Sequence, residues 1–478
     1  MTNATRDGKK VIPIAVAEPD EEMISLYAAH KKIYPRSVKG VFSNWRWIMV
    51  WVTQIIFYGL PWLEWGQRQA VLFDLSVRRF YIFGLVLYPQ DFIYLTGMLI
   101  IAALSLFLFT AVAGRLWCGY ACPQTVYTEI FLWIEKLVEG DRAARIRRDE
   151  GAFSAEKLWR KTGKHFLWIV FSLWTGFTFV GYFVPIRDMG GLLLTMNLAA
   201  WEIFWVFFYG FATYGNAGFM REQVCLHMCP YARFQSAMFD KDTLIVTYDT
   251  ERGEPRGARS KKADPAKLNL GACVDCSLCV QVCPTGIDIR NGLQYQCIGC
   301  GACADVCDTV MDKVGYPRGL VKYSTENAMA NHWTQKQTVR HVFRPRVLVY
   351  TSILTTIVLA IFISLAMRTP FKVDVVRDRG VMARVVEAGT TENVYRLQIM
   401  NATEADQRYK ISVSGLPKLL ISSDTTFKVE STKAITVPVR VQLPFEGAAP
   451  GSHVIHFDIE SLDSPGKLLE KSTFIVPQ

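Results

Sequence analysis

Twelve cysteines carry most of the chemical information in this 478-residue chain, and all of them lie between Cys118 and Cys307. Eight of them form two runs, from Cys273 and from Cys297. The first run spaces its cysteines by two, two and three residues and is followed by Pro284, and the second run repeats the spacing. Bacterial ferredoxins use this spacing to hold two [4Fe–4S] clusters, and the fourth cysteine of each run binds the other cluster.

This exchange of the fourth cysteine predicts the ligands of each cluster. One cluster should be bound by Cys273, Cys276, Cys279 and Cys307, and the second by Cys297, Cys300, Cys303 and Cys283. Small residues between the ligands allow backbone N–H groups to approach the sulfurs. A zinc ribbon also uses CxxC pairs, but zinc takes four ligands, whereas these eight cysteines form two interlocked sets. Asp308 stands where a second proline is usual, which removes no ligand.

The remaining four cysteines form a repeated CxxxCP motif, Cys118 and Cys122 before Pro123, and Cys225 and Cys229 before Pro230. Proline is well placed at the first position of a helix, so Cys122 and Cys229 should each precede a helix. A helix N-terminus lowers the pKa of a cysteine and favours the thiolate. Thiolates bind Cu(I), zinc or iron–sulfur clusters, and the intervening His227 and Met228 favour copper. Whether the two motifs form one site or two stays open at this point.

The elements that carry these cysteines are expected to lie in and beside a membrane. The composition is 51% hydrophobic and 20% charged, which excludes a disordered chain. Each of five apolar runs is long enough to cross a bilayer: 45–63, 92–114, 165–186, 192–219 and 346–367. Lys and Arg concentrate in the 136–164 loop, which predicts that this loop and residues 220–345 are cytoplasmic. The net charge of +10 fits such loops, and no nucleic-acid partner is expected.

The sequence therefore predicts a multi-domain membrane protein with an α-helical bundle of about five spans. The apolar 66–90 loop is expected to lie at the membrane interface as a hairpin. Alternating apolar and polar residues after 370 predict a sandwich of about seven strands. The expected parts are a cytoplasmic N-terminal tail (1–41), a four-span membrane domain with both CxxxCP motifs (42–230), a cytoplasmic dicluster ferredoxin domain (231–345), a fifth transmembrane helix (346–367) and a periplasmic β-sandwich (368–478).

Nearly the whole chain resembles the CcoG/FixG/RdxA family of accessory proteins for assembly of cbb-type cytochrome c oxidase. The resemblance rests on the ferredoxin motif and on residues 70–91 (AVLFDLSVRRFYIFGLVLYPQD), 117–123 (WCGYACP) and 216–235 (NAGFMREQVCLHMCPYARFQ). The chain is also similar to a wider group of membrane ferredoxins, NapH and NosR, which share the CxxxCP pairs. The resemblance implies an immunoglobulin-like C-terminal domain and a location in the bacterial inner membrane.

The same resemblance implies a cupric reductase that supplies Cu(I) to the oxidase. Cys118, Cys122, Cys225 and Cys229 would then be the catalytic, copper-binding cysteines. The cofactors would be two [4Fe–4S] clusters and copper. The expected partners are membrane lipid, a cytoplasmic electron donor, and a copper chaperone or other assembly factors of the oxidase. Two alternatives stay open: a NapH- or NosR-like relay to or from quinone or a periplasmic partner, and a non-enzymatic copper chaperone or assembly scaffold.

Overall fold

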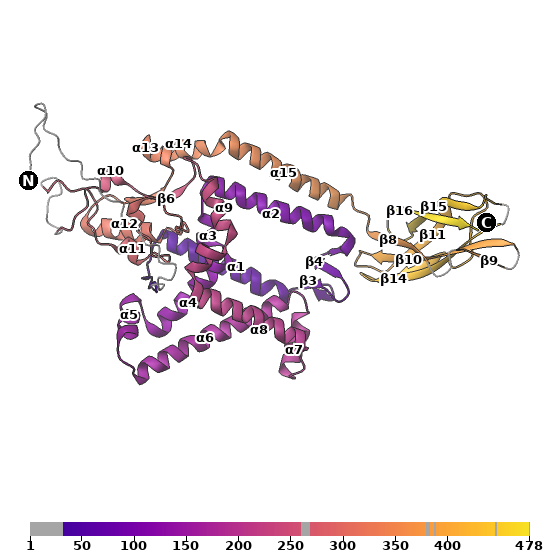
Figure 1. Ribbon diagram of the computed structural model, residues 1–478, viewed down its shortest axis with the longest axis horizontal. Helices are drawn as coiled ribbons and strands as arrows, with labels where there is room; N and C mark the ends of the chain where they lie inside the picture. Colours follow the sequence, from indigo (N-terminus) through magenta and orange to yellow (C-terminus); the bar gives the residue numbers. More distant parts are fainter. Residues whose placement is uncertain (1–31, 260–267, 379–382, 387–388, 445–446, 478) are drawn as a thin grey trace, which may run out of the picture.

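The computed structural model describes residues 32–259, 268–378, 383–386, 389–444 and 447–477. These residues form three parts along the longest axis of the molecule (Figure 1). A small module with the eight ferredoxin cysteines lies at one end, long helices lie in the middle, and a β-sandwich lies at the other end. Residues 1–31, which hold most of the expected N-terminal tail, lie outside the described residues.

The middle part is helical because its apolar runs are long and largely free of glycine, proline and charge. Three short turns extend its helices: η1 (Leu60–Trp62), η2 (Pro89–Asp91) and the π-helical η3 (Asn216–Met220). Its helices are α1 (Val41–Gly59), α2 (Phe92–Ala113), α3 (Leu116–Tyr120), α4 (Pro123–Glu139), α5 (Arg142–Glu150), α6 (Ala155–Val180), α7 (Ile186–Leu194), α8 (Ala200–Gly215), α9 (Pro230–Met238) and α15 (Pro345–Ala366).

Two helices of the described chain are long and apolar enough to cross a membrane. They are Pro89–Ala113, with a mean hydropathy of 2.4, and Pro345–Ala366, with a mean hydropathy of 2.3. These segments, α2 with η2 and α15, run side by side (Figure 1), and a hydrogen bond of 2.9 Å joins the hydroxyls of Tyr94 and Ser364. The other three spans stay a prediction.

The apolar run 192–219, which was expected to span the membrane, does not form one continuous helix. α7 ends at Leu194 and α8 begins at Ala200. Between them Met196 adopts a left-handed conformation with φ of 56°. The carboxylate of Glu202 then accepts a hydrogen bond of 3.0 Å from the N–H of Ala199 and caps α8. The run 165–186 is also divided, because α6 ends at Val180 and a turn precedes α7.

The 66–90 segment forms short strands that pack on the β-sandwich. A three-stranded antiparallel sheet consists of β3 (Val71–Asp74), β4 (Arg79–Ile82) and β5 (Leu85–Leu87), preceded by the pair β1 (Glu64–Trp65) and β2 (Arg68–Gln69). Its buried Leu72, Tyr81 and Val86 contact Met400 of the sandwich. The apolar side chains of this segment are therefore covered by protein and not only by the expected membrane interface.

The cysteine-rich module is a small α+β unit. Strands β6 (Ile245–Tyr248) and β7 (Val321–Ser324) pair in an antiparallel register and bring together two distant parts of the chain. A core that includes Met311 and Leu320 packs under them. The helical elements of this region are α10 (Thr250–Gly253), α11 (Leu278–Gln281), η6 (Ile289–Asn291), α12 (Ala302–Val314), α13 (Glu326–Ala330), α14 (Gln335–Arg340) and η7 (His341–Phe343).

The C-terminal part is a sandwich of two antiparallel sheets, with nine strands in the described residues where about seven were expected. Fully buried rings such as Tyr395, Phe457 and Phe474 fill the space between the sheets. One sheet has β12 (Leu420–Ile421), β14 (Ala434–Pro444), β10 (Thr390–Asn401), β8 (Phe371–Arg377) and β9 (Arg384–Val386). The other has β13 (Thr426–Val429), β11 (Gln407–Ser414), β15 (Gly451–Ser461) and β16 (Lys467–Val476).

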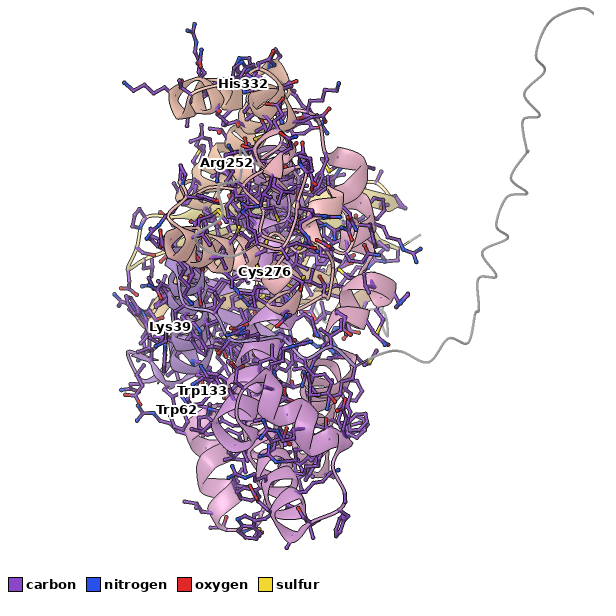
Figure 2. All side chains as sticks on the ribbon, turned by 90° about the vertical axis from the view of Figure 1, so that its left-hand side faces the viewer. Lys39, Trp62, Trp133, Arg252, Cys276 and His332 are labelled. Atoms are coloured by element: carbon purple, nitrogen blue, oxygen red, sulfur yellow. The ribbon has the colours of Figure 1, made fainter. Side chains whose placement is uncertain are left out.

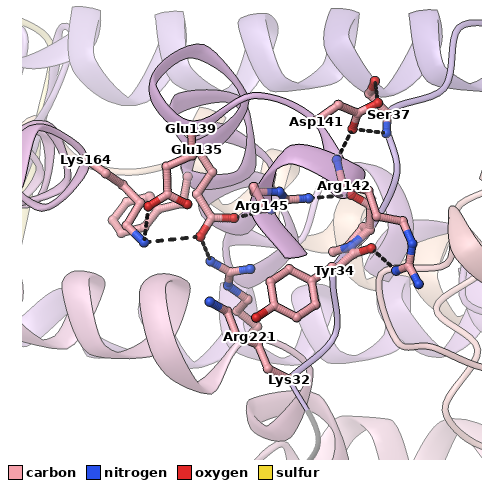
Figure 3. A network of polar contacts seen from close by, with 12 residues as sticks. Lys32, Tyr34, Ser37, Glu135, Glu139, Asp141, Arg142, Arg145, Lys164 and Arg221 are labelled. Carbon is pink, nitrogen blue, oxygen red and sulfur yellow. Dashed lines mark hydrogen bonds and ion pairs between the residues drawn. The ribbon is translucent and has the colours of Figure 1, made fainter. Parts of the chain in front are cut away.

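Residues 32–40 are held in place and do not form a free tail. The guanidinium of Arg145 donates to the carbonyl of Pro35 at 2.5 Å, and the side chain of Asp141 accepts from the N–H and hydroxyl of Ser37 at 3.1 Å. Figure 3 shows the contact between Ser37 and Asp141, and Arg145 between this contact and the carboxylate of Glu135. Glu135 forms ion pairs with three cations, Arg145 at 2.5 Å, Arg221 at 2.7 Å and Lys164 at 3.9 Å. This network therefore joins the N-terminal segment, α4, α5 and α6.

Candidate functional site

The ferredoxin module brings its eight cysteines together around two small hollows. One hollow is lined by Cys273, Cys276, Cys279 and Cys307. The other is lined by Cys283, Cys297, Cys300 and Cys303, and Cys279 lines it as well. These are the two sets that the sequence spacing assigns to separate clusters. Cys276 is the exposed member, at the end of the molecule that faces the viewer in Figure 2.

The thiols of each hollow lie close enough to influence one another. Burial and the neighbouring Cys279, Cys273 and Cys276 raise the pKa of Cys307 to about 12. Burial likewise raises the pKa of Cys297 to about 12, with contributions from Cys300 and Cys283. Thiolates gathered in this way repel one another unless metal ions neutralise them.

The donor set and the loop conformation fit [4Fe–4S] clusters. Gly299 and Gly301 adopt φ of 65° and 73°, which lets the second loop turn around its hollow. A side chain at Gly301 would lie 2.8 Å from the ring of Phe42. Two sets of four cysteines around two hollows are the donor set that a pair of [4Fe–4S] clusters requires.

The CxxxCP cysteines occupy equivalent places at two helix starts. Cys122 is extended and directly precedes α4, and Cys229 is extended and directly precedes α9. Their prolines take the first helical position. Cys118 lies in α3, and Cys225 lies in the π-helical turn η4 (Val224–Met228). The repeat in the sequence therefore corresponds to a repeat in local structure.

The four CxxxCP thiols converge, and we refer to them as the thiol cluster. The pKa of Cys225 is raised to about 12 by burial, and Cys122, Cys118 and Cys229 add to the shift. The thiol of Cys118 also lies 3.4 Å from the side-chain oxygen of Gln235 in α9, the helix that begins directly after Cys229, so the two motifs lie side by side. His227 and Met228, which the sequence suggested as copper ligands, are exposed, whereas the four cysteines are partly buried.

The expectation of a lowered thiol pKa at the helix start is wrong for Cys122. Burial raises its pKa, and the hydrogen bonds from the backbone of Gln124 and Thr125 oppose this only in part. Burial also raises the pKa of Cys118 to about 11. Desolvation therefore outweighs the effect of the helix terminus at both cysteines and favours the neutral thiol.

The thiol cluster lies directly against the second ferredoxin loop. The side chain of Cys118 packs on the buried group that contains Ile298 and Cys300. A Cβ atom at Gly119 would lie only 2.9 Å from both the Cα of Cys300 and the carbonyl oxygen of Ile298. Only glycine permits this approach, and the α3 backbone therefore touches the loop that supplies ligands to the second hollow.

Arg115 joins the two sites, a role that its place at the end of a span did not predict. Its guanidinium donates to the carbonyl oxygens of Tyr295 at 2.5 Å and Cys297 at 3.5 Å. It also donates to the carbonyl of Ala232 in α9. The same cation lowers the pKa of both Cys118 and Cys297 against the larger effect of burial.

Gln235 is a second residue that the sequence gave no reason to select. It is completely buried in α9, and the thiol of Cys118 donates to its side-chain oxygen at 3.4 Å. Its side-chain nitrogen is buried and has no hydrogen-bond partner among the described residues. A spacing rule for metal ligands does not find such a residue, because glutamine is not itself a soft ligand.

Comparisons with protein families support the iron–sulfur assignment. A model described as a 4Fe-4S dicluster domain matches residues 220–326, which contain the eight ferredoxin cysteines and Cys225 and Cys229. A model described as a 4Fe-4S binding domain matches residues 95–139, which contain Cys118 and Cys122. A model described as an IG-like fold at the C-terminal of FixG matches residues 361–477. The C-terminal sandwich is therefore immunoglobulin-like, as expected.

Relatives match over most of the chain. It is 37% identical to the nitrogen fixation protein FixG of Rhizobium meliloti, with 91% of each chain covered. It is 40% identical to the protein RdxA of Cereibacter sphaeroides, with 87% of each chain covered. A crystal structure of a FixG-related protein from Vibrio parahaemolyticus aligns with 23% of this chain and 97% of its own, at 25% identity and a TM-score of 0.21. The chain therefore belongs to the FixG/RdxA family of membrane iron–sulfur proteins.

Proposed function

We propose that this protein reduces Cu(II) to Cu(I) at the thiol cluster and supplies the Cu(I) for assembly of a cbb-type cytochrome c oxidase. Copper is the substrate. In this proposal the protein lies in the bacterial inner membrane, with the ferredoxin module in the cytoplasm and the sandwich in the periplasm. A copper chaperone or another assembly factor of the oxidase receives the Cu(I).

One observation carries the proposal: Gly119, between the thiols of Cys118 and Cys122, touches the loop of Cys300. An electron donor and a metal-binding thiol group that share a wall are suited to electron transfer onto the bound metal. When bound, the two [4Fe–4S] clusters supply the single electron with which each Cu(II) ion becomes Cu(I).

In this proposal the residues of the chain bind the copper, and the binding cysteines release their thiol protons. Because the pKa of Cys118 is raised to about 11, its thiol loses a proton when a copper–sulfur bond forms. Soft thiolates then favour Cu(I) over Cu(II), which stabilises the reduced product. Arg115 fixes the ferredoxin loop against α9, and Gln235 orients the sulfur of Cys118 through the hydrogen bond.

Metal and acid-labile sulfide analysis tests the assignment. The wild-type protein, prepared anaerobically and loaded with copper, should contain about eight irons and bound copper. The quadruple variant Cys118→Ala, Cys122→Ala, Cys225→Ala and Cys229→Ala should keep the iron and lose both the copper and the Cu(II) reductase activity. Full activity of the quadruple variant would contradict the proposal.

A third iron–sulfur cluster is the second candidate occupant of the thiol cluster. The family model that matches residues 95–139 is described as a 4Fe-4S binding domain, and this range contains Cys118 and Cys122 but none of the ferredoxin cysteines. Iron content separates the two candidates. About twelve irons in the wild type and about eight in the quadruple variant would indicate a third cluster, and copper would then react elsewhere.

A further inference from the structure

A large cavity lies beside the ferredoxin module and is not used by the proposed reaction. Its volume is about 720 Å³, within the range of small-molecule sites. α1, α4 and α6 form most of its wall, and the N-terminal segment and the ferredoxin module complete it.

The two kinds of lining residue in this cavity differ in chemistry. One group is charged or hydroxylated and includes Arg46 and Glu129, which form an ion pair across the cavity wall. The other group is aromatic. Its members are Trp47, Trp51, Tyr58, Trp133, Phe171 and Trp174. A ligand that fits both groups has a flat ring with polar substituents and an apolar remainder.

The aromatic residues reach the outer surface of the helical part. Trp51 is 64% exposed, Trp133 is 51% exposed, and Ile55 on the same helix as Trp51 is 65% exposed. Trp51 and Ile55 belong to the expected membrane span 45–63, where exposed aromatic and aliphatic side chains face lipid. A ligand dissolved in the bilayer can therefore enter the cavity from its side.

The inner wall of the cavity is also a wall of the second cysteine hollow. Pro284 and Ala302 line both of them, and Pro284 directly follows Cys283. Val282, on the other side of Cys283, lines the cavity as well. A molecule in the cavity is thus separated from the second hollow by a single layer of residues, which is a suitable distance for electron exchange.

We propose that this cavity binds a membrane quinol and that the quinol is the electron donor of the protein. This inference rests on the proposed function for the identity of the electron acceptor, which is Cu(II). One quinol and two Cu(II) ions give one quinone, two Cu(I) ions and two protons, and the protons are released to water. This donor replaces the cytoplasmic donor expected from the sequence.

Binding of decylubiquinone to the full-length protein in nanodiscs tests the site directly. Titration calorimetry should give saturable binding to one site. Trp133→Ala and Trp51→Ala should each weaken the affinity at least fivefold, because each removes an aromatic wall. Trp201→Ala is the matched control: Trp201 is 73% exposed on α8, is not a lining residue, and should bind as the wild type does. Equal affinities in all four proteins would overturn the proposal.

A second variant and a second readout distinguish the loss of the binding site from misfolding of the protein. Ile130→Trp fills the cavity from α4 and should abolish quinone binding while dithionite still produces the electron paramagnetic resonance signal of reduced clusters. Decylubiquinol should produce that signal in the wild type and not in Ile130→Trp. Native lipid that stays in the cavity and excludes the quinone, or reduction by a soluble donor alone, would also overturn the proposal.

The quadruple cysteine variant separates this proposal from the proposed function. It should bind decylubiquinone with wild-type affinity, because no cysteine of the thiol cluster lines the cavity. Quinone binding without any copper reduction by the wild type would refute the proposed function and leave the quinol site standing.

Discussion

The neutral side-chain amide of Gln235 can form a hydrogen bond with either the thiol or the thiolate of Cys118. In the protonated form, the thiol of Cys118 donates to the side-chain oxygen of Gln235. In the metal-bound form, Cys118 is a thiolate and accepts hydrogen bonds, and the side-chain nitrogen of Gln235 has no other partner among the described residues. Hydrogen bonds to charged groups are stronger than neutral ones, so the amide should favour the thiolate.

The substitution Gln235→Leu should therefore weaken Cu(I) binding. Loss of one hydrogen bond to a charged sulfur corresponds to about 1.5–3 kcal/mol, or roughly a tenfold to hundredfold lower affinity. Competition with a Cu(I) chelator measures this affinity. Gln124→Leu is the control, since the side chain of Gln124 bonds to the backbone oxygens of Asn216 and Arg221. An equal loss of Cu(I) affinity in both variants would show that Gln235 acts only through the stability of the fold.

At the scale of elements, the start of α1 is capped by the ferredoxin module. The buried carboxylate of Asp305 in α12 accepts hydrogen bonds from the backbone N–H groups of Phe42 at 3.1 Å and Ser43 at 2.7 Å. A Cβ atom at Gly40 would lie 2.2 Å from this carboxyl carbon, so the approach requires glycine. One carboxylate therefore fixes the second cysteine loop relative to the helical part.

We expect Asp305→Ala to lower the free energy of unfolding by about 1–2 kcal/mol, the usual cost of a lost helix cap. Thermal unfolding of the purified protein measures this. Asp312→Ala on the same helix removes an exposed carboxylate paired with Arg318 and should leave the unfolding temperature unchanged. An unchanged unfolding temperature in Asp305→Ala would contradict the capping role.

Glu135 should make the stability of the helical part depend on pH. Burial raises its pKa, but Arg221, Arg145 and Lys164 together hold the pKa below its ordinary value. The stabilisation is therefore complete above the pKa of the unfolded chain, about 4.3, and is lost as the pH falls toward the lower pKa of the folded state. Lowering the pH through this range should reduce the unfolding temperature of the wild type.

The substitution Glu135→Gln leaves buried cations without their partner and should cost about 3–5 kcal/mol at neutral pH. It should also flatten the acid dependence. Unfolding temperatures at neutral pH and at several pH values below about 4.3 give both quantities. Glu156→Gln is the control because the side chain of Glu156 is 67% exposed. A wild-type acid dependence in Glu135→Gln would show that other carboxylates cause it.

The sequence predicted the elements better than their contacts. The spacing from Cys273 to Cys307 predicts two sets of four cysteines; in the structure each set lines one of two hollows, and Cys279 lines both. The alternation around Leu397 likewise predicted strands. The approach of Gly119 to Cys300 could not be predicted, because the two residues lie far apart in the sequence. Burial depends on such contacts, so the direction of the pKa shift of Cys122 was also beyond sequence reasoning.

At the scale of the whole molecule, the helix pair α2 and α15 connects the two ends. At one end Asp91, before α2, forms ion pairs with Arg368 and Lys372, which follow α15. At the other end Arg344, before α15, pairs with Asp240 at 2.8 Å. The ion pairs of Asp91 therefore attach the sandwich to the helical part, and the ion pair of Arg344 attaches the start of α15.

The substitution Tyr88→Phe should loosen this attachment. The buried hydroxyl of Tyr88 donates to the carbonyl oxygens of Asn401 at 2.9 Å and Thr432 at 3.3 Å. Its loss should cost about 1–3 kcal/mol, because two buried carbonyls lose a donor. Hydrogen exchange around residues 401 and 432 should become faster. Tyr94→Phe removes the exposed bond to Ser364 and should leave this exchange unchanged.

Single-turnover reduction of copper tests the central claim most directly, namely that the thiol cluster receives electrons from the ferredoxin module. The anaerobic protein is reduced with dithionite, freed of reductant and mixed with Cu(II), and the cluster absorption and Cu(I) formation are followed together. One Cu(I) should form for each electron lost, and the quadruple cysteine variant should lose its electrons at least a hundredfold more slowly. Equal rates in the two proteins would contradict the account.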